Sequence, residues 1–183
     1  RGTRPAMRSS DGAEYLSLLA GARTWTKPAC SRHFGATPEE VRQLTESVAD
    51  LLHGQVLSRD ELVSELVQDK RFKRMEEQLR SGWGALLKPL AWQGALCYGP
   101  SPSSKATFTH PASLLKNWNG LPDPAEAAPA VIKRYLPAYG PATPETFSAW
   151  LSRNSNKKST PRSWFASLGE QIVEGRVEGE KRD

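Results

Sequence analysis

With 183 residues, the chain is long enough for one large domain or two small ones. Hydrophobic residues make up 38% of it, and no apolar run approaches the ~20 residues that a transmembrane helix needs, which excludes an integral membrane protein. The net charge is +5, which is compatible with an acidic partner.

The residue types that bind metals are too scattered for a zinc motif. Cys30 and Cys97 are far apart, and His33, His53 and His110 complete no metal-ligand spacing with them. Phosphate-binding glycine loops and the sequence motifs of hydrolases are also absent. We therefore expect a cytoplasmic protein that holds no metal and no cofactor. Because the chain begins without Met and ends in a charged run, we also expect a piece of a longer protein.

Helix starts are well marked in the first half of the chain. A helix is expected over residues 11–22, followed by a basic, aromatic connector up to residue 34. Thr37 and Ser58 each precede a glutamate by three residues, a spacing that forms a capping box and predicts a helix after each of them. The charged segment 70–78 then leads toward a third helix.

The third helix and a two-stranded hairpin are predicted next. The helix lies between residues 83 and 93 and is limited by Pro89, which lacks a backbone donor. Strands at 95–98 and 105–109 enclose the turn-rich loop 99–104. Three helices followed by a hairpin is the order of a winged helix, a helix-turn-helix variant in which this loop is the wing.

The second half of the chain repeats this pattern. Helices are predicted at 127–139, 144–151 and 160–168, followed by a strand at 172–177 that begins a second wing. The expected fold class is mainly α with small β hairpins, built from tandem winged-helix units. The expected organisation is a remnant of a preceding winged-helix unit plus connector (1–34), a winged-helix unit (35–116), a linker (117–125) and a second winged-helix unit truncated at its wing (126–183).

Acidic residues avoid two stretches that contain the third helix of each predicted unit. Neither 78–122 nor 146–169 contains Asp or Glu, although both contain Lys and Arg. Such segregated charge can follow the phosphates of DNA, and serines in the wing can add hydrogen bonds to them. The predicted contacts to double-stranded DNA are Arg80, Lys88, Ser101, Ser103, Ser104 and Lys105 in the first unit, and Arg153, Lys157, Lys158 and Arg162 in the second.

The tryptophans could either stack on bases or fill the core. Helical spacing favours the core for Trp92 and Trp150. Trp83 is flanked by glycines, which would let a partner approach the backbone closely.

Several ordered motifs point to one bacterial family. They are Gln93-Gly94-Ala95-Leu96-Cys97-Tyr98-Gly99-Pro100, then Tyr139-Gly140-Pro141-Ala142-Thr143-Pro144, and the opening Arg1-Gly2-Thr3. In these motifs the chain resembles a family of tandem winged-helix DNA-binding proteins that includes the AlkZ-like DNA glycosylases. Glycosylases of this family excise alkylated bases and unhook interstrand crosslinks. The resemblance implies duplex DNA binding within a DNA repair protein.

One motif of that family has no counterpart in this chain. The glycosylases resemble one another in a catalytic Gln-x-Gln or Gln-x-Asp motif upstream of the Arg-Gly-Thr segment, but no glutamine here has Gln, Asp or Glu two residues later. Arg4-Pro5 also stands where the family usually has Leu-His. We therefore expect this segment to grip DNA, while base excision belongs to a longer parent protein.

Two other functions stay open as alternatives. A transcription regulator would read the major groove with its third helix, but only Lys88 and Gln93 are polar between residues 83 and 93, which disfavours base readout. A winged helix that binds another protein and no nucleic acid is the second alternative. It predicts that reversing the charges of residues 153–162 leaves DNA affinity unchanged.

Overall fold

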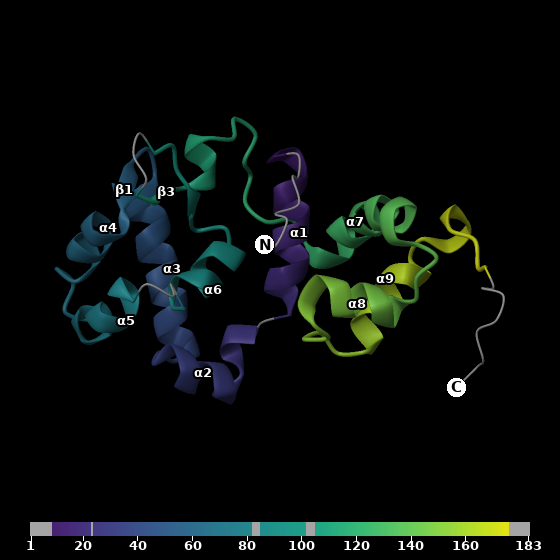
Figure 1. The fold of residues 1–183 in the computed structure, drawn as a ribbon, viewed down its shortest axis with the longest axis horizontal. Helices are drawn as coiled ribbons and strands as arrows, with labels where there is room; N and C mark the ends of the chain where they lie inside the picture. The colour runs from purple at the N-terminus through teal and green to yellow at the C-terminus, as the bar shows by residue number, and fades with distance from the viewer. Residues whose placement is uncertain (1–8, 23, 82–84, 102–104, 176–183) are drawn as a thin grey trace. The chain divides into compact units, whose positions relative to one another are not determined.

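The computed structural model describes residues 9–22, 24–81, 85–101 and 105–175 (Figure 1). The chain divides into two compact units, Arg1–Pro122 and Asp123–Asp183. The described residues are mainly helical, with one small three-stranded sheet, which confirms the predicted mainly α class. Among them, no helix is both long and apolar enough to cross a membrane.

The first unit holds the sheet and most of the helices. Its helices are α1 (Ser9–Gly21), α2 (Pro28–Phe34), α3 (Pro38–Leu52), α4 (Arg59–Leu66), α5 (Glu76–Arg80) and α6 (Leu87–Trp92). Its strands are β1 (Val56–Ser58), β2 (Cys97–Tyr98) and β3 (Thr107–Thr109). Short 3-10 helices lie at Thr24–Thr26, Lys73–Met75 and Pro111–Ser113.

Helix α3 is central to the core of the first unit because one of its faces is apolar. Val41, Leu44, Val48 and Leu52 recur every three or four residues, and all four are fully buried. Both α4 and α6 pack against this helix. This buried stripe is therefore the surface against which α4 and α6 pack.

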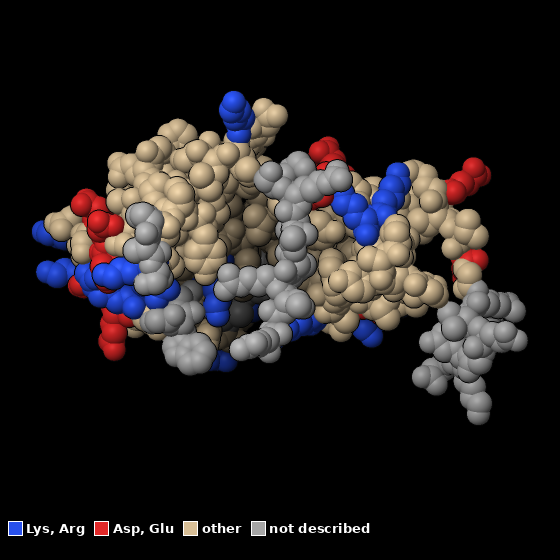
Figure 2. All heavy atoms as spheres, turned by 45° about the horizontal axis from the view of Figure 1, so that its top comes forward, with Lys and Arg blue, Asp and Glu red and all other residues tan. Residues whose placement is uncertain are grey.

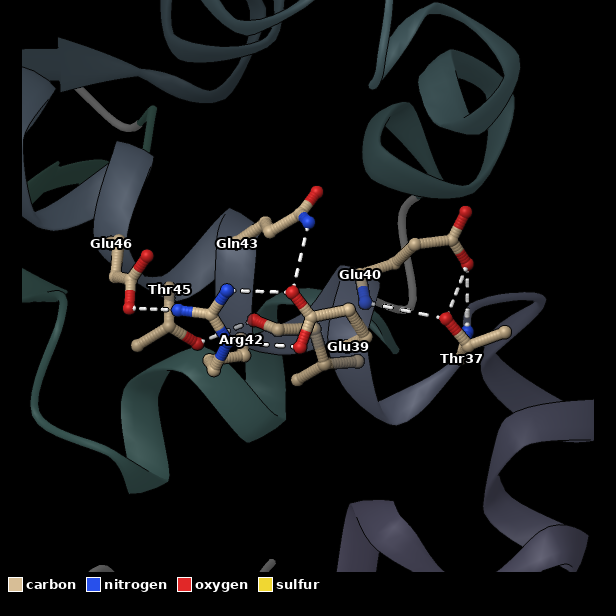
Figure 3. A network of polar contacts seen from close by, with 8 residues as sticks. Thr37, Glu39, Glu40, Arg42, Gln43, Thr45 and Glu46 are labelled. Atoms are coloured by element: carbon tan, nitrogen blue, oxygen red, sulfur yellow. Dashed lines mark hydrogen bonds and ion pairs between the residues drawn. The ribbon is translucent and has the colours of Figure 1, made fainter.

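The start and the outer face of α3 are held by local polar contacts (Figure 3). The hydroxyl of Thr37 accepts from the backbone N–H of Glu40 at 3.3 Å, and the Glu40 carboxylate accepts from the Thr37 N–H at 2.8 Å, which confirms the predicted capping box. On the outer face, Arg42 bonds Glu39 at 2.6 Å and Glu46 at 2.5 Å. The pKa of Glu39 is lowered to about 2, mainly by the hydrogen bond from Arg42 and also by that from Gln43. The positive charge of Arg42 is thus offset by two carboxylates of its own helix.

Two helices form where the sequence predicted none. Helix α2 lies in the expected connector, and α5 lies in the expected charged segment. Phe72, Met75 and Leu79 explain the second case, because they recur three and four residues apart and are buried in the core. The charged residues between them hid this spacing in the sequence.

The sheet has strand order β1-β3-β2 with antiparallel pairs. Phe108 at its centre lies opposite Leu57 of β1 and Tyr98 of β2, and it is buried. The strands of the hairpin are shorter than predicted. Ala95 and Leu96 are buried core residues that follow the turn after α6, and the Ala95 N–H still donates to the Leu90 carbonyl at 3.1 Å. Strand pairing therefore begins only at Cys97.

The turn after α6 depends on a glycine. Gly94 has φ +75°, and a Cβ placed on it would lie 2.9 Å from Cζ2 of Trp118. We expect Gly94→Ala to destabilise the first unit by about 2–4 kcal/mol, because left-handed backbone strain adds to overpacking. Urea unfolding should show the loss. Gly54→Ala is the matched control, since Gly54 has φ +72° with open space around it, and its cost should be only about 1–2 kcal/mol.

The second unit is helical throughout its regular part. Its elements are α7 (Pro124–Tyr139), α8 (Pro144–Ser152), α9 (Ser159–Ala166) and a 3-10 helix at Gly169–Gln171. The core includes Val131, Ile132 and Phe147, all fully buried. The strand predicted at 172–177 is wrong over 172–175, where the chain forms no strand, and 176–177 fall outside the described residues. The apolar residues of this segment form no strand because a β-strand needs a partner to pair with, and the described part of the second unit contains none.

Candidate nucleic-acid interface

Arg80 is the first predicted contact, and its position differs from the expected one. It ends α5, while the third predicted helix, α6, begins only at Leu87. Its guanidinium contacts Asp60 at 3.3 Å and Glu76 at 3.0 Å, and it donates to the Ser64 hydroxyl at 3.2 Å. Because two carboxylates offset its charge, Arg80 offers little net positive potential to a phosphate.

Lys88 is the exposed cation of α6. Leu87, Pro89 and Leu90 are buried, so this short helix turns its apolar residues inward around a single exposed lysine. Gln93, which follows the helix, donates its side-chain amide to the Thr45 hydroxyl and to the Pro89 carbonyl, both at 3.0 Å. The side-chain amide of Gln93, the second polar residue of the predicted helix, is therefore engaged by hydrogen bonds inside the first unit.

The hairpin loop between β2 and β3 is closed by its own hydrogen bonds. The Gly99 N–H donates to the Thr107 carbonyl at 2.9 Å, and the Thr107 hydroxyl donates to the Pro100 carbonyl at 3.1 Å. The Ser101 hydroxyl donates to the Lys105 carbonyl at 2.5 Å. Ser101 thus braces the loop, while the predicted contacts Ser103 and Ser104 lie outside the described residues.

Lys105 is exposed at the end of this loop and lies in the field of an acidic residue of α4. The pKa of Glu61 is lowered, mainly by the hydrogen bonds from Ser58 that form the α4 capping box, and also by the charge of Lys105. The Glu61 carboxylate therefore caps α4 and also partly offsets the charge of Lys105.

In the second unit, Arg153 and Asn154 form a tight turn after α8. Both residues have left-handed backbone, with φ of 52° and 58°. The Arg153 N–H donates to the Ala149 carbonyl at 3.0 Å, and the Asn154 N–H to the Ser148 carbonyl at 3.2 Å. The helix end is thereby capped, and Arg153, Lys157 and Lys158 are exposed in the segment that leads to α9.

Arg162 of α9 is paired with an acidic residue outside the acid-free stretch. Its Nε and Nη2 atoms contact Oε1 of Glu145 at 2.8 and 2.6 Å. The hydrogen bond from Arg162 is the main reason why the pKa of Glu145 is lowered. Arg162, like Arg80, is therefore offset by a carboxylate that the sequence did not place beside it.

Of the predicted cations, some are paired with carboxylates and others face solvent, although all of them come from the acid-free stretches. Figure 2 shows Lys and Arg side chains of the first unit interleaved with Asp and Glu side chains on the face that it draws. The exposed predicted cations that contact no carboxylate in the described structure come from the acid-free stretches: Lys88, Arg153, Lys157 and Lys158. These residues and Lys105 form the candidate phosphate-binding set.

Metal-binding side chains are dispersed over the described residues. These residues bring together no group of three or more His, Cys, Asp or Glu side chains that could hold a metal ion. A cleft of about 460 Å³ in the first unit is lined by Lys116, Asn117, Trp118 and neighbouring residues, with no carboxylate or histidine in its lining.

The chain belongs to the AlkZ-like family. The model of this family, described as DNA glycosylase AlkZ-like, matches residues 1–183. It is 56% identical over 182 residues to an interstrand DNA cross-link repair glycosylase of Streptomyces sahachiroi, a match that covers 99% of this chain and 49% of that protein. The solved structure of Streptomyces sahachiroi DNA glycosylase AlkZ matches with a TM-score of 0.91 at 55% identity, over 95% of this chain and 47% of the other. The chain spans about half the length of these relatives.

Proposed function

We propose that this chain binds duplex DNA, mainly through phosphates, as the DNA-gripping segment of a DNA glycosylase-like repair protein. The observation that carries the proposal is the set of exposed cations in acid-free stretches of a chain that belongs to a glycosylase family. Lys88 and Lys105 serve the first unit. Arg153, Lys157 and Lys158 serve the second. Arg80 and Arg162 contribute less, because carboxylates already bind them.

The winged helix is the proposed scaffold of this grip. In the first unit, α3, β1, α4, α6, β2 and β3 follow one another in the order of a winged helix, and β1 pairs with the hairpin. The unit proper is assigned to residues 35–116, with 1–34 as a remnant of a preceding unit and 117–125 as a linker. In the proposed second winged-helix unit, predicted over 126–183, the three helices are α7, which begins at Pro124, α8 and α9.

The geometry of α6 favours phosphate contact over sequence readout. A helix that reads the major groove presents several polar side chains to base edges. Here Lys88 is the exposed polar side chain of α6, and Gln93 is engaged by Thr45. This arrangement disfavours a transcription regulator.

Base excision is assigned to the full-length protein. The relatives named above are glycosylases, one of them for interstrand crosslinks. Excision of an alkylated or crosslinked base requires the nucleotide to leave the base stack, and a grip on the flanking duplex would hold the DNA while this happens. The residues that hold the water that attacks the sugar carbon would come from outside this chain, since its glutamines do not form the family motif.

Salt dependence of binding tests the grip directly. We expect the affinity of the chain for a short fluorescent duplex, measured by anisotropy between about 50 and 200 mM salt, to fall with a log–log slope near −4 to −5. Five contacting cations at about −0.9 each give this slope. The absence of binding at low salt would overturn the proposal and favour a protein partner.

A further inference from the structure

Two aromatic rings of the second unit touch each other at the surface. Tyr139 at the end of α7 is 56% exposed, and Trp150 of α8 is 42% exposed. Their ring centroids are 5.5 Å apart. The sequence predicted Trp150 to be a core anchor, and this was wrong, because the ring lies at the edge of the core and keeps much of its surface in solvent.

The exposed pair rests on a buried aromatic base. The Tyr135 ring lies 5.2 Å from Tyr139 and 4.8 Å from Trp150. Phe147 lies 6.0 Å from Trp150 and is fully buried. These contacts fix the two exposed rings before any partner arrives, so little conformational freedom remains to be lost on binding.

The segment that follows Trp150 carries positive charge. Arg153, the left-handed C-cap of α8, follows Trp150 by three residues and is exposed. Lys157 and Lys158 follow in the same acid-free stretch. The acidic residue of α8, Glu145, is already bound by Arg162. An exposed aromatic ring and exposed cations within one short, acid-free stretch of chain match the chemistry of an unpaired nucleotide, a flat base joined to a phosphate.

We propose that Tyr139 and Trp150 form a stacking platform for an unpaired nucleobase of DNA, with Arg153 at the adjoining phosphate. This inference rests on the proposed DNA-binding function and adds a preference within it. A base displaced from the helix at a distorted site would stack on the exposed rings, while the duplex on either side is held by its phosphates. A base of any type has a π face, so the platform selects unpaired structure and not sequence.

Three duplexes of equal length test this platform. One is fully paired, one carries a central bulge of unpaired thymidines, and one carries the same bulge built from abasic spacers. Anisotropy at constant salt should show that the chain binds the thymidine bulge about tenfold more tightly than the other two. The abasic bulge keeps the phosphates and the bend, so the difference reports base stacking.

Variants assign the preference to the two rings. Trp150→Leu and Tyr139→Leu should abolish it and leave the salt slope on paired duplex unchanged. Trp150→Phe keeps a ring and should retain most of the preference. Val173→Ala, at a residue of the same unit that is 94% exposed, is the control and should change nothing. Thermal unfolding of each variant checks that the second unit stays folded.

The outcomes separate the two proposals. Equal affinity for thymidine and abasic bulges, together with salt-dependent duplex binding, overturns the platform and leaves the phosphate grip standing. A thymidine preference that survives both leucine substitutions also overturns it. A chain that binds none of the three duplexes at low salt overturns both.

Discussion

Replacing Lys157 and Lys158 together by glutamate should weaken duplex binding by about 100-fold at 0.1 M salt. Each lost phosphate contact removes about 0.9 from the log–log salt slope, so the slope should become shallower by about 2. The physical reason is that both lysines are exposed in a stretch of sequence without acidic residues, and that Glu145, whose pKa is lowered mainly by Arg162 and least by Lys158, is already bound by Arg162. Anisotropy titrations at several salt concentrations measure both effects.

The control for this double variant has the same chemistry at a different place. Lys70→Glu with Lys73→Glu changes the net charge by the same amount, and both lysines are exposed. They lie among Asp69, Glu76 and Glu77, which partly neutralise the positive charge of this segment. We expect this control to weaken binding by less than about threefold at the same salt. Equal losses of DNA affinity for the two double variants would mean that binding depends on net charge alone and not on the position of Lys157 and Lys158. No loss of affinity for either variant would favour a protein partner.

Phe147→Ala should unfold the second unit or destabilise it by about 3–5 kcal/mol. The ring is fully buried and lies 5.1 Å from Tyr135 and 5.7 Å from Phe165, so three segments of the unit lose their shared contact. A unit of this size has a small core and little stability to spare. Urea unfolding followed by tryptophan fluorescence measures the loss, since Trp150 and Trp164 lie in this unit.

A conservative variant separates packing from the ring itself. Phe147→Leu keeps most of the buried apolar volume and should cost roughly half as much as Phe147→Ala. The unfolding transition of the first unit should stay in place for both variants. A loss below about 1 kcal/mol for Phe147→Ala would show that Phe147 does not organise this core. If the grip proposal holds, the alanine variant should also lose the DNA contacts of Lys157 and Lys158.

Features determined by neighbouring residues were predictable from the sequence. The capping boxes at Thr37 and Ser58 form as expected, because each involves residues only three positions apart. The short strand β1 was not predicted. Three residues carry too little alternation to identify a strand, and this one exists through its pairing with β3.

The candidate interface was less predictable, because its electrostatics depend on contacts between distant residues. Arg80 and Asp60 are 20 positions apart, and Arg162 and Glu145 are 17. An acid-free stretch of sequence therefore does not guarantee an acid-free surface. The exposure of Trp150 was also hidden, since helical spacing shows which residues share a face and not where the core ends.

The hydrogen bond that closes the first unit has a consequence for the order of folding. The Ser17 hydroxyl of α1 donates to the Pro122 carbonyl at 2.7 Å, across a separation of 105 residues, and α1 packs against α6. The partners of α1 are therefore synthesised long after α1 itself. Closing so long a loop is entropically unfavourable until the segments between have collapsed. We expect α1 to dock late, after α3 and α4 have formed their contacts, and to complete the first unit only when Pro122 has left the ribosome.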